Sequence, residues 1–157
     1  MSSETIVTAL FLIAAVVAAG VLISALFPAI HRTTSTFGAV SHEADTQIRT
    51  DFKIVNAFAN ASNINIWLKN IGSTRIANNE LDQSDIFLGD GNNIIRLPLQ
   101  DHYELPEGNN FWDPGETLSI PILATDYPTL EFSSGDKVYI QIVLSNGVKR
   151  DMEFDFP

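Results

Sequence analysis

The stretch Ile6–Phe27, IVTALFLIAAVVAAGVLISALF, decides the first part of the fold because it holds 22 consecutive residues without a charge. At about 1.5 Å of rise per residue, a helix of this length spans about 33 Å, enough to cross the hydrocarbon core of a bilayer. The run is apolar on every side rather than along one stripe, which disfavours a helix in the core of a soluble domain. We therefore predict a membrane helix at about residues 5–27.

A cleaved secretory signal is the main alternative for this stretch, and the residues before it argue against that alternative. Such a signal needs a basic segment, a shorter apolar run and a small-residue cleavage site. Residues Met1–Thr5 contain Glu4 and neither Lys nor Arg. We therefore expect the helix to be retained as an anchor.

Small residues recur four positions apart along the predicted membrane helix. This spacing lets two helix backbones approach closely in lipid, where packing drives association. A helix that is simply rich in alanine and stands alone is an equal alternative. The candidate helix-packing residues are Ala14, Ala15, Ala18, Ala19, Gly20 and Ser24.

Pro28 follows the apolar stretch and is expected to kink or end the helix, because proline lacks an N–H and clashes with the preceding turn. Helical spacing nevertheless resumes beyond it, with one apolar stripe on a polar helix. The sequence therefore predicts one long, kinked helix over about residues 4–50, whose second half is an amphipathic stalk. The stripe consists of Ile30, Phe37, Val40, Ala44 and Ile48.

After Asp51 the pattern changes to short apolar segments separated by turn residues. No helix-length apolar pattern lies between them, which favours two packed antiparallel sheets. We predict an all-β domain, an immunoglobulin-like β-sandwich of about seven strands, behind the partly transmembrane helix. The expected domains are residues 1–50 and 51–157. The candidate strands are residues 51–60, 63–69, 84–88, 93–99, 117–123, 137–144 and 148–156.

The alternation of apolar and polar residues along the last two candidate strands predicts the register in which they pair. A two-residue turn at Asn146-Gly147 would mix apolar and polar side chains on each face. A three-residue loop over residues 145–147 instead pairs Leu144 with Val148 and Ile140 with Met152, and it keeps one face apolar. Gly147 would supply the left-handed bulge position of such a loop.

Composition excludes several classes of function. Nine Lys and Arg against nineteen Asp and Glu give a net charge of −10, which argues against a nucleic-acid binder. The absence of cysteine excludes thiol catalysis and Cys-ligated metals. No histidine pair has metal-ligand spacing, and no Gly-x-Ser-x-Gly motif occurs. We predict no catalytic residue, no metal site and no cofactor, and we interpret Asp101–Glu104 as a polar loop.

Two aromatic residues and one asparagine are candidates for surface roles. Trp112 and Tyr127 lie in predicted loops, either as buried anchors or as a partner surface, since aromatics are enriched in interface cores. Trp67 lies within a candidate strand and is expected in the core. Asn60 begins Asn60-Ala61-Ser62, the acceptor pattern of N-glycosylation.

An apolar N-terminal helix, a stalk and a small β-sandwich form a plan that resembles type IV pilin-like proteins. The opening Ser3–Ala9 (SETIVTA) and the motif Leu26–Ile30 (LFPAI) resemble the N-terminus of the FlaF/FlaG families of archaeal flagellin-like proteins. The resemblance is most specific over residues 2–40. No basic leader with a Lys/Arg-Gly site precedes the helix, which favours an accessory protein of the archaellum over a filament subunit.

The resemblance implies a non-enzymatic protein of the archaeal motility motor. Such a protein would belong to the stator, span the membrane once and place its β-domain outside the cell. The implied partners are a FlaF-like archaellum protein, further copies of the same chain and the S-layer. An archaellin or pilin-type filament subunit and a cell-surface binding module are the alternatives. Arg32 alone would place the β-domain inside by the positive-inside rule, and the resemblance overrides this single charge.

Overall fold

The structure is a computed structural model and describes residues 2–60, 62–106 and 110–157. The chain divides into two compact units, Met1–Glu43 and Ala44–Pro157. The last turn and a half of the helix belongs to the second unit together with the sheets.

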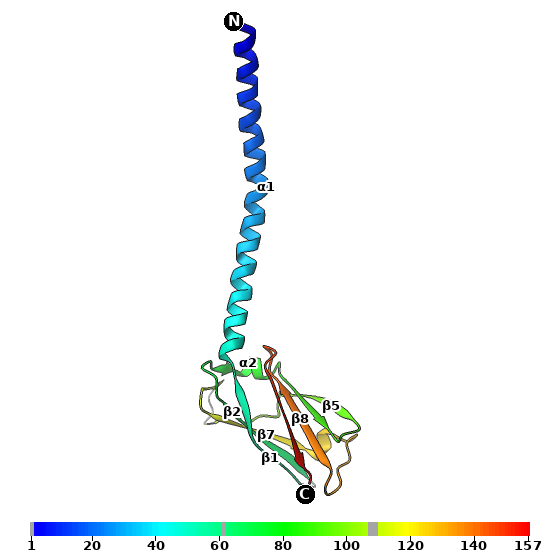
Figure 1. Cartoon of the computed structure of the whole chain (residues 1–157). Helices are drawn as coiled ribbons and strands as arrows, with labels where there is room; N and C mark the ends of the chain where they lie inside the picture. Colours follow the sequence, from blue (N-terminus) through cyan, green and yellow to red (C-terminus); the bar gives the residue numbers. More distant parts are fainter. Residues whose placement is uncertain (1, 61, 107–109) are drawn as a thin grey trace. The chain divides into compact units, whose positions relative to one another are not determined.

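The first element is α1 (Ser2–Arg49), a helix of 48 residues (Figure 1). Pro28 lies inside it and does not end it, and the predicted kink stays a prediction. Hydroxyl groups on both sides of Pro28 bond back to helix carbonyls, as Thr8 does to Glu4 O and Thr33 to Ala29 O. The class all-β is therefore too narrow for the chain, because nearly a third of it is helical.

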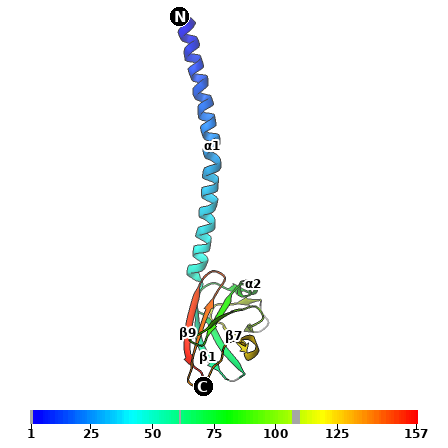
Figure 2. The same cartoon turned by 90° about the vertical axis from the view of Figure 1, so that its right-hand side faces the viewer.

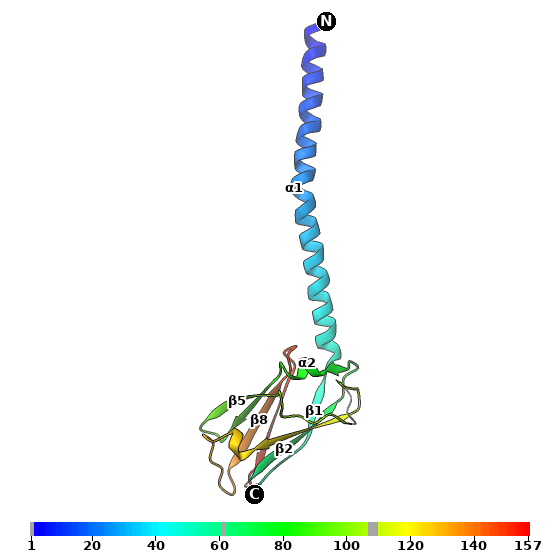
Figure 3. The same cartoon turned by 180° about the vertical axis from the view of Figure 1, so that it is seen from behind.

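The second unit holds nine described strands, all paired antiparallel, rather than about seven. One sheet has the order β1-β2-β7, and a second has the order β5-β4-β8-β9 (Figure 1, and from behind in Figure 3). The first sheet comprises β1 (Phe52–Ala59), β2 (Asn63–Asn70) and β7 (Thr117–Leu123). The second comprises β4 (Asp85–Gly89), β5 (Ile94–Pro98), β8 (Lys137–Val143) and β9 (Lys149–Asp155).

Several short elements were not predicted from the sequence. The strands β3 (Ile76–Ala77) and β6 (Phe111–Trp112) pair with each other. The short helix α2 (Asn78–Leu81) follows β3, and the 3-10 helix η2 (Ala124–Asp126) follows β7. Glu80 accepts a hydrogen bond from Ala77 N at 2.9 Å, which helps to hold the start of α2.

One hydrophobic core lies between the sheets. Inward residues alternate with outward ones along β2, where Ile64, Ile66 and Leu68 are fully buried, and along β8, where Val138, Ile140 and Ile142 are. This is the period-2 pattern from which the strands were predicted. Phe52 and Trp112 add an aromatic contact, with ring centroids 6.3 Å apart.

The register of the β8–β9 hairpin is confirmed. Ile140 pairs with Met152 and Lys137 with Asp155, and Leu144 N donates to Val148 O at 2.9 Å. Gly147 has a φ of +83°, the left-handed conformation that the three-residue loop requires.

The sheets meet along one side, where β1 lies beside β9 (Figure 2). Arg150 at the start of β9 forms an ion pair with Asp51, immediately before β1. The edges of two different sheets therefore cover each other on this side of the domain.

Candidate functional site

The apolar part of α1 has the properties of a membrane segment. Its large apolar side chains are all solvent-exposed in the isolated chain, with Phe11 73% and Val16 71% exposed. The helix is long enough and apolar enough to cross a membrane, on the grounds of length and composition. An exposed apolar surface of this extent is unfavourable in water, at about 25 cal/mol per Å². Lipid or other protein therefore has to cover this segment.

The six small residues of this segment are exposed as well. A Cβ added at Gly20 would meet no atom within 4 Å. Within the described chain nothing packs against these positions, so the fold itself does not require their small size. Their role in helix packing stays a prediction.

The last turn of α1 is joined tightly to the sheet domain. Ser73 N donates to Arg49 O at 2.9 Å, and Gly72 N donates to Asp51 O at 2.8 Å. A Cβ on Gly72 would lie 2.5 Å from Arg49 O and 2.6 Å from Asp51 N, so only glycine fits there. Backbone contacts thus fix the end of the helix against the loop that follows β2.

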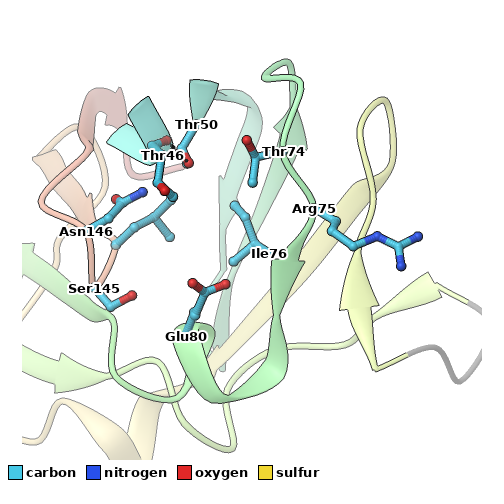
Figure 4. A pocket seen from close by; sticks show the side chains of 9 residues that line it. Thr46, Thr50, Thr74, Arg75, Ile76, Glu80, Ser145 and Asn146 are labelled. Carbon is cyan, nitrogen blue, oxygen red and sulfur yellow. Dashed lines mark hydrogen bonds between the residues drawn. The ribbon is translucent and has the colours of Figure 1, made fainter. Parts of the chain in front are cut away.

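A small pocket lies at this junction (Figure 4). Thr46 and Thr50 line it from the end of α1 and the residue after it, Glu80 from α2, and Ser145 and Asn146 from the β8–β9 loop. Its interior leaves about 10 Å³ for water, room for one molecule at most. The pocket is part of the joint between helix and sheets rather than a ligand site.

Trp112 and Tyr127 correct the prediction of a partner surface. Trp112 is fully buried and its indole N–H donates to Glu116 O at 3.1 Å, while Tyr127 is 5% exposed. The Tyr127 ring meets Phe132 edge-on at 5.8 Å, and burial raises the pKa of its hydroxyl, with a smaller effect of the Asp126 charge. Both residues match the alternative of buried loop anchors, because their rings complete the core.

Residues of the polar stretch Asp101–Glu104 make contacts within the sheet domain. Tyr103 donates to Asp82 at 2.9 Å, and burial followed by the Asp82 interaction raises its pKa to about 12. His102 lies 3.5 Å from the Asp126 carboxylate. Within residues 2–60, 62–106 and 110–157, no group of three or more His, Asp or Glu could hold a metal ion.

Asn60 lies in the turn between β1 and β2. Its side-chain carbonyl accepts hydrogen bonds from Ser62 N at 2.8 Å and Asn63 N at 2.9 Å. These bonds hold the side-chain oxygen and involve none of the amide hydrogens that glycosylation would replace. Ala61, the middle residue of the acceptor pattern, lies outside the described residues.

The outer face of the β1-β2-β7 sheet is a surface that sequence reasoning missed. Trp67, expected in the core, is only partly buried, because its neighbours Ile66 and Leu68 point inward and alternation sends Trp67 outward. Phe58 is 49% and Leu123 54% exposed on the same side of the sheet. We call this surface the lysine face: Lys53, Phe58, Trp67, Lys69, Pro121 and Leu123.

The charge of the lysine face is unusual for this chain. Lys53 and Lys69 are directly opposite each other across β1 and β2, an arrangement that repulsion between like charges disfavours. Neither lysine has an ion-pair partner among the described residues, whereas Arg75, Arg96 and Lys137 each pair with an aspartate. The strands β1, β2 and β7 contain no Asp or Glu at all.

The free sheet edges are poorly suited to strand addition. On β7, Ser119 is already bridged to Glu104, and Pro121 has no N–H to donate. On β5, Pro98 closes the end of the strand. Proline and short edge strands are common means of preventing edge-to-edge pairing. Faces rather than edges are therefore the surfaces available for partners.

Two sequence comparisons match nearly the whole chain, helix and sheet domain alike. The sequence model of archaeal-type flagellin matches residues 2–154. An uncharacterized protein of Archaeoglobus fulgidus is 30% identical and covers 99% of this chain and 100% of its own length.

Two kinds of solved structure share the fold. The periplasmic stator protein FlaG of the Sulfolobus acidocaldarius archaellum is 23% identical with a TM-score of 0.54, covering 67% of this chain and 99% of its own. In its complex with FlaF the TM-score is 0.52, with 66% of this chain covered and 87% of that one. The archaeal flagellum of Methanospirillum hungatei is 16% identical with a TM-score of 0.72, covering 95% and 91% of the two chains.

Proposed function

The chain belongs to the archaeal-type flagellin family, and from that premise we propose that it is a membrane-anchored accessory protein of the archaellum, part of the stator. It is a structural archaellum component, not an enzyme. A stator resists torque and therefore needs one hold in the membrane and a second hold on another envelope structure. The apolar segment of α1 supplies the first hold, and the sheet domain supplies the second.

One observation carries this proposal: an apolar helix with exposed side chains is continuous in sequence with a sheet domain whose fold is shared with FlaG. The FlaG-like residues Ser3–Ala9 and Leu26–Ile30 add to it, because they lie outside the sheet domain. The finer division that we propose is a membrane helix and stalk over residues 1–50 and an immunoglobulin-like domain over 51–157.

A filament subunit is the second candidate, and one comparison favours it. The Methanospirillum hungatei flagellum matches 95% of this chain, helix included, with the higher TM-score. Filament subunits pack their apolar helices against one another, whereas an anchor keeps its helix in lipid. The two candidates therefore differ in what covers the apolar segment.

The proposed location is the cell membrane, crossed once, with the sheet domain outside. The proposed partners are a FlaF-like protein, in line with the FlaF–FlaG complex of Sulfolobus acidocaldarius, further copies of this chain and the S-layer. Within the membrane we propose the six small residues from Ala14 to Ser24 as helix contacts, with a kink at Pro28. Outside, Asn60 is the proposed glycan acceptor.

Deletion of the gene tests the proposal. We expect cells without the protein to lose swimming, and complementation to restore it. In the complemented strain, a tagged chain should remain with the cell membrane when filaments are sheared off. Normal swimming of the deletion strain would contradict any motor role. Recovery of the chain as the major component of sheared filaments would establish the filament subunit instead.

A further inference from the structure

Charged side chains stand at both ends of the apolar segment of α1, and their spacing matches a bilayer. Glu4 precedes the segment and Arg32 follows it, and no other Asp, Glu, Lys or Arg lies between them. The helix is continuous over these 28 positions, which correspond to a rise of about 42 Å. A bilayer measures about 40–45 Å when its headgroup regions are included. The two charges can therefore lie in the headgroup regions of opposite leaflets at the same time.

The Arg32 guanidinium has no partner within its own chain. It is the only Lys or Arg side chain in the first 48 residues. The next carboxylate along α1, that of Glu43, is 11 positions away, about 16 Å along the helix and beyond the reach of an i,i+4 pair. Arg32 forms no ion pair among the described residues, whereas Arg49 in the last turn pairs with Asp45 at 2.9 Å. Its N–H donors are therefore available to a ligand outside the chain.

The residues around Arg32 suit the boundary between hydrocarbon and water. Toward the apolar segment, the His31 ring contacts the Phe27 ring with centroids 5.2 Å apart, and histidine combines an apolar body with a polar tip. On the other side, the four hydroxyl residues 33–36 all donate back to helix carbonyls, at 2.8 to 3.0 Å. Because those hydroxyl protons are already used, Arg32 is the strongest hydrogen-bond donor left at this level of the helix.

We propose that Arg32 binds the phosphate of a membrane lipid headgroup and so fixes the depth of α1 in the bilayer. The inference rests on the membrane anchor proposed above and names the lipid group that holds it. A planar guanidinium donates two parallel N–H bonds to two phosphate oxygens, which is a strong and directional contact. Movement of the helix in one direction would pull Arg32 into hydrocarbon, and movement in the other would pull in Glu4. The two charges therefore oppose sliding of the helix along its own axis.

Solid-state NMR of the full-length chain in lipid vesicles measures this contact directly. The chain, labelled with ¹³C at the arginine Cζ atoms, is reconstituted in phosphatidylglycerol vesicles in phosphate-free buffer, so that all ³¹P belongs to lipid. We expect ³¹P to dephase the ¹³C signal of Arg32. Arg32→Lys should remove the dephased signal. Arg49→Lys, 17 positions further along α1, is the matched control and should leave it unchanged.

A second preparation separates lipid phosphate from free phosphate. Digalactosyl diacylglycerol vesicles contain no phosphorus, and inorganic phosphate is added to their buffer. We expect no dephasing at Arg32 in this preparation. Dephasing there would overturn the lipid headgroup as the ligand in favour of any dissolved phosphate.

The fixing of depth is tested by a thiol in the cysteine-free chain. Thr36→Cys in phosphatidylglycerol vesicles should react with a membrane-impermeant maleimide. Addition of Arg32→Leu should lower the rate several-fold, because the helix can then slide inward, whereas addition of Arg32→Lys should keep it. An unchanged rate with Arg32→Leu would overturn the role of Arg32 in setting the depth.

Flotation of the phosphatidylglycerol vesicles separates this contact from the membrane anchor itself. A chain that floats with the vesicles but shows no dephasing at Arg32 would overturn the phosphate contact and leave the anchor standing. A chain that does not float would overturn the anchor. Dephasing that persists in Arg32→Lys would assign the contact to another arginine and overturn the inference.

Discussion

The two units of this chain use the same residue types in opposite ways. In the second unit, Ile, Leu and Val are buried between sheets, as with Ile66 and Ile140, which have no exposed surface. In the first unit, Ile13 and Leu12 are more than 60% exposed and lie on a helix that is apolar all round. The hydrophobic effect favours burial of these side chains in the second unit, whereas the apolar side chains of the first unit stay exposed in the isolated chain. The difference indicates that the apolar part of the first unit, Ile6–Phe27, needs a covering of lipid or other protein.

The largest expected effect comes from removing a buried side chain of the second unit. Trp112→Ala should lower the free energy of unfolding of the sheet domain by about 3–5 kcal/mol, because it empties a fully buried site beside Phe52. Denaturant unfolding followed by circular dichroism measures the loss. Trp67→Ala is the matched control, since Trp67 lies on the outer face, and it should cost only about 1 kcal/mol. Equal costs for the two tryptophans would contradict the distinction between core and face.

A charge introduced into the apolar stretch of α1 tests the environment of the first unit. Val17→Arg places arginine near the middle of the apolar stretch and should disfavour membrane insertion by about 2.5–3.5 kcal/mol. Carbonate extraction of membranes should then release the variant and retain the wild type. Thr36→Arg, in the polar second half of α1, is the control and should be retained. Retention of Val17→Arg would mean that this segment does not lie in lipid.

Two glycines give effects of about 1 kcal/mol with opposite signs. Gly38 lies on the exposed helix, where a Cβ meets no atom within 4 Å, so Gly38→Ala should stabilise the helix by about 1 kcal/mol. Gly147 has a φ of +83°, so Gly147→Ala should destabilise the β8–β9 hairpin by about 1 kcal/mol. Helicity and unfolding midpoints of the two variants check this, and stabilisation by Gly147→Ala would contradict the left-handed loop.

The smallest effect is a dependence on alkaline pH. The pKa of Tyr103 is raised to about 12, so its contribution to stability is complete below the unfolded pKa of about 10 and is lost as the pH rises toward 12. Tyr103→Phe should be less stable near pH 9 and should lose part of this slope. Thermal unfolding between pH 9 and 12 measures both, and an unchanged slope would contradict the assignment to Tyr103.

The sequence predicts best where periodicity and burial coincide. Alternation along residues 137–156 predicted both strands and their register, because a slip of one residue would exchange the two faces. The apolar run Ile6–Phe27 predicted its helix for a different reason, because its length and uniformly apolar composition suit a membrane helix. The short strands β3 and β6 were missed because two residues carry no period.

The surfaces were harder to predict because exposure depends on tertiary structure. Trp112 follows a turn-rich stretch, where the sequence left a buried anchor and a partner surface both open, and the structure places it in β6, where it fills the core. Trp67 looked buried among Ile66 and Leu68, yet strand alternation directs it outward. The cross-strand pairing of Lys53 with Lys69 joins positions 16 residues apart and follows only from the register of β1 and β2.

Labelling in intact cells tests most directly whether the apolar helix holds the sheet domain outside the membrane. Ser145→Cys introduces a single thiol into the exposed β8–β9 loop of a cysteine-free chain. The protein should be recovered with the membrane and should react with a membrane-impermeant maleimide before lysis. Labelling that appears only after lysis, or a chain found in the soluble fraction, would contradict the account.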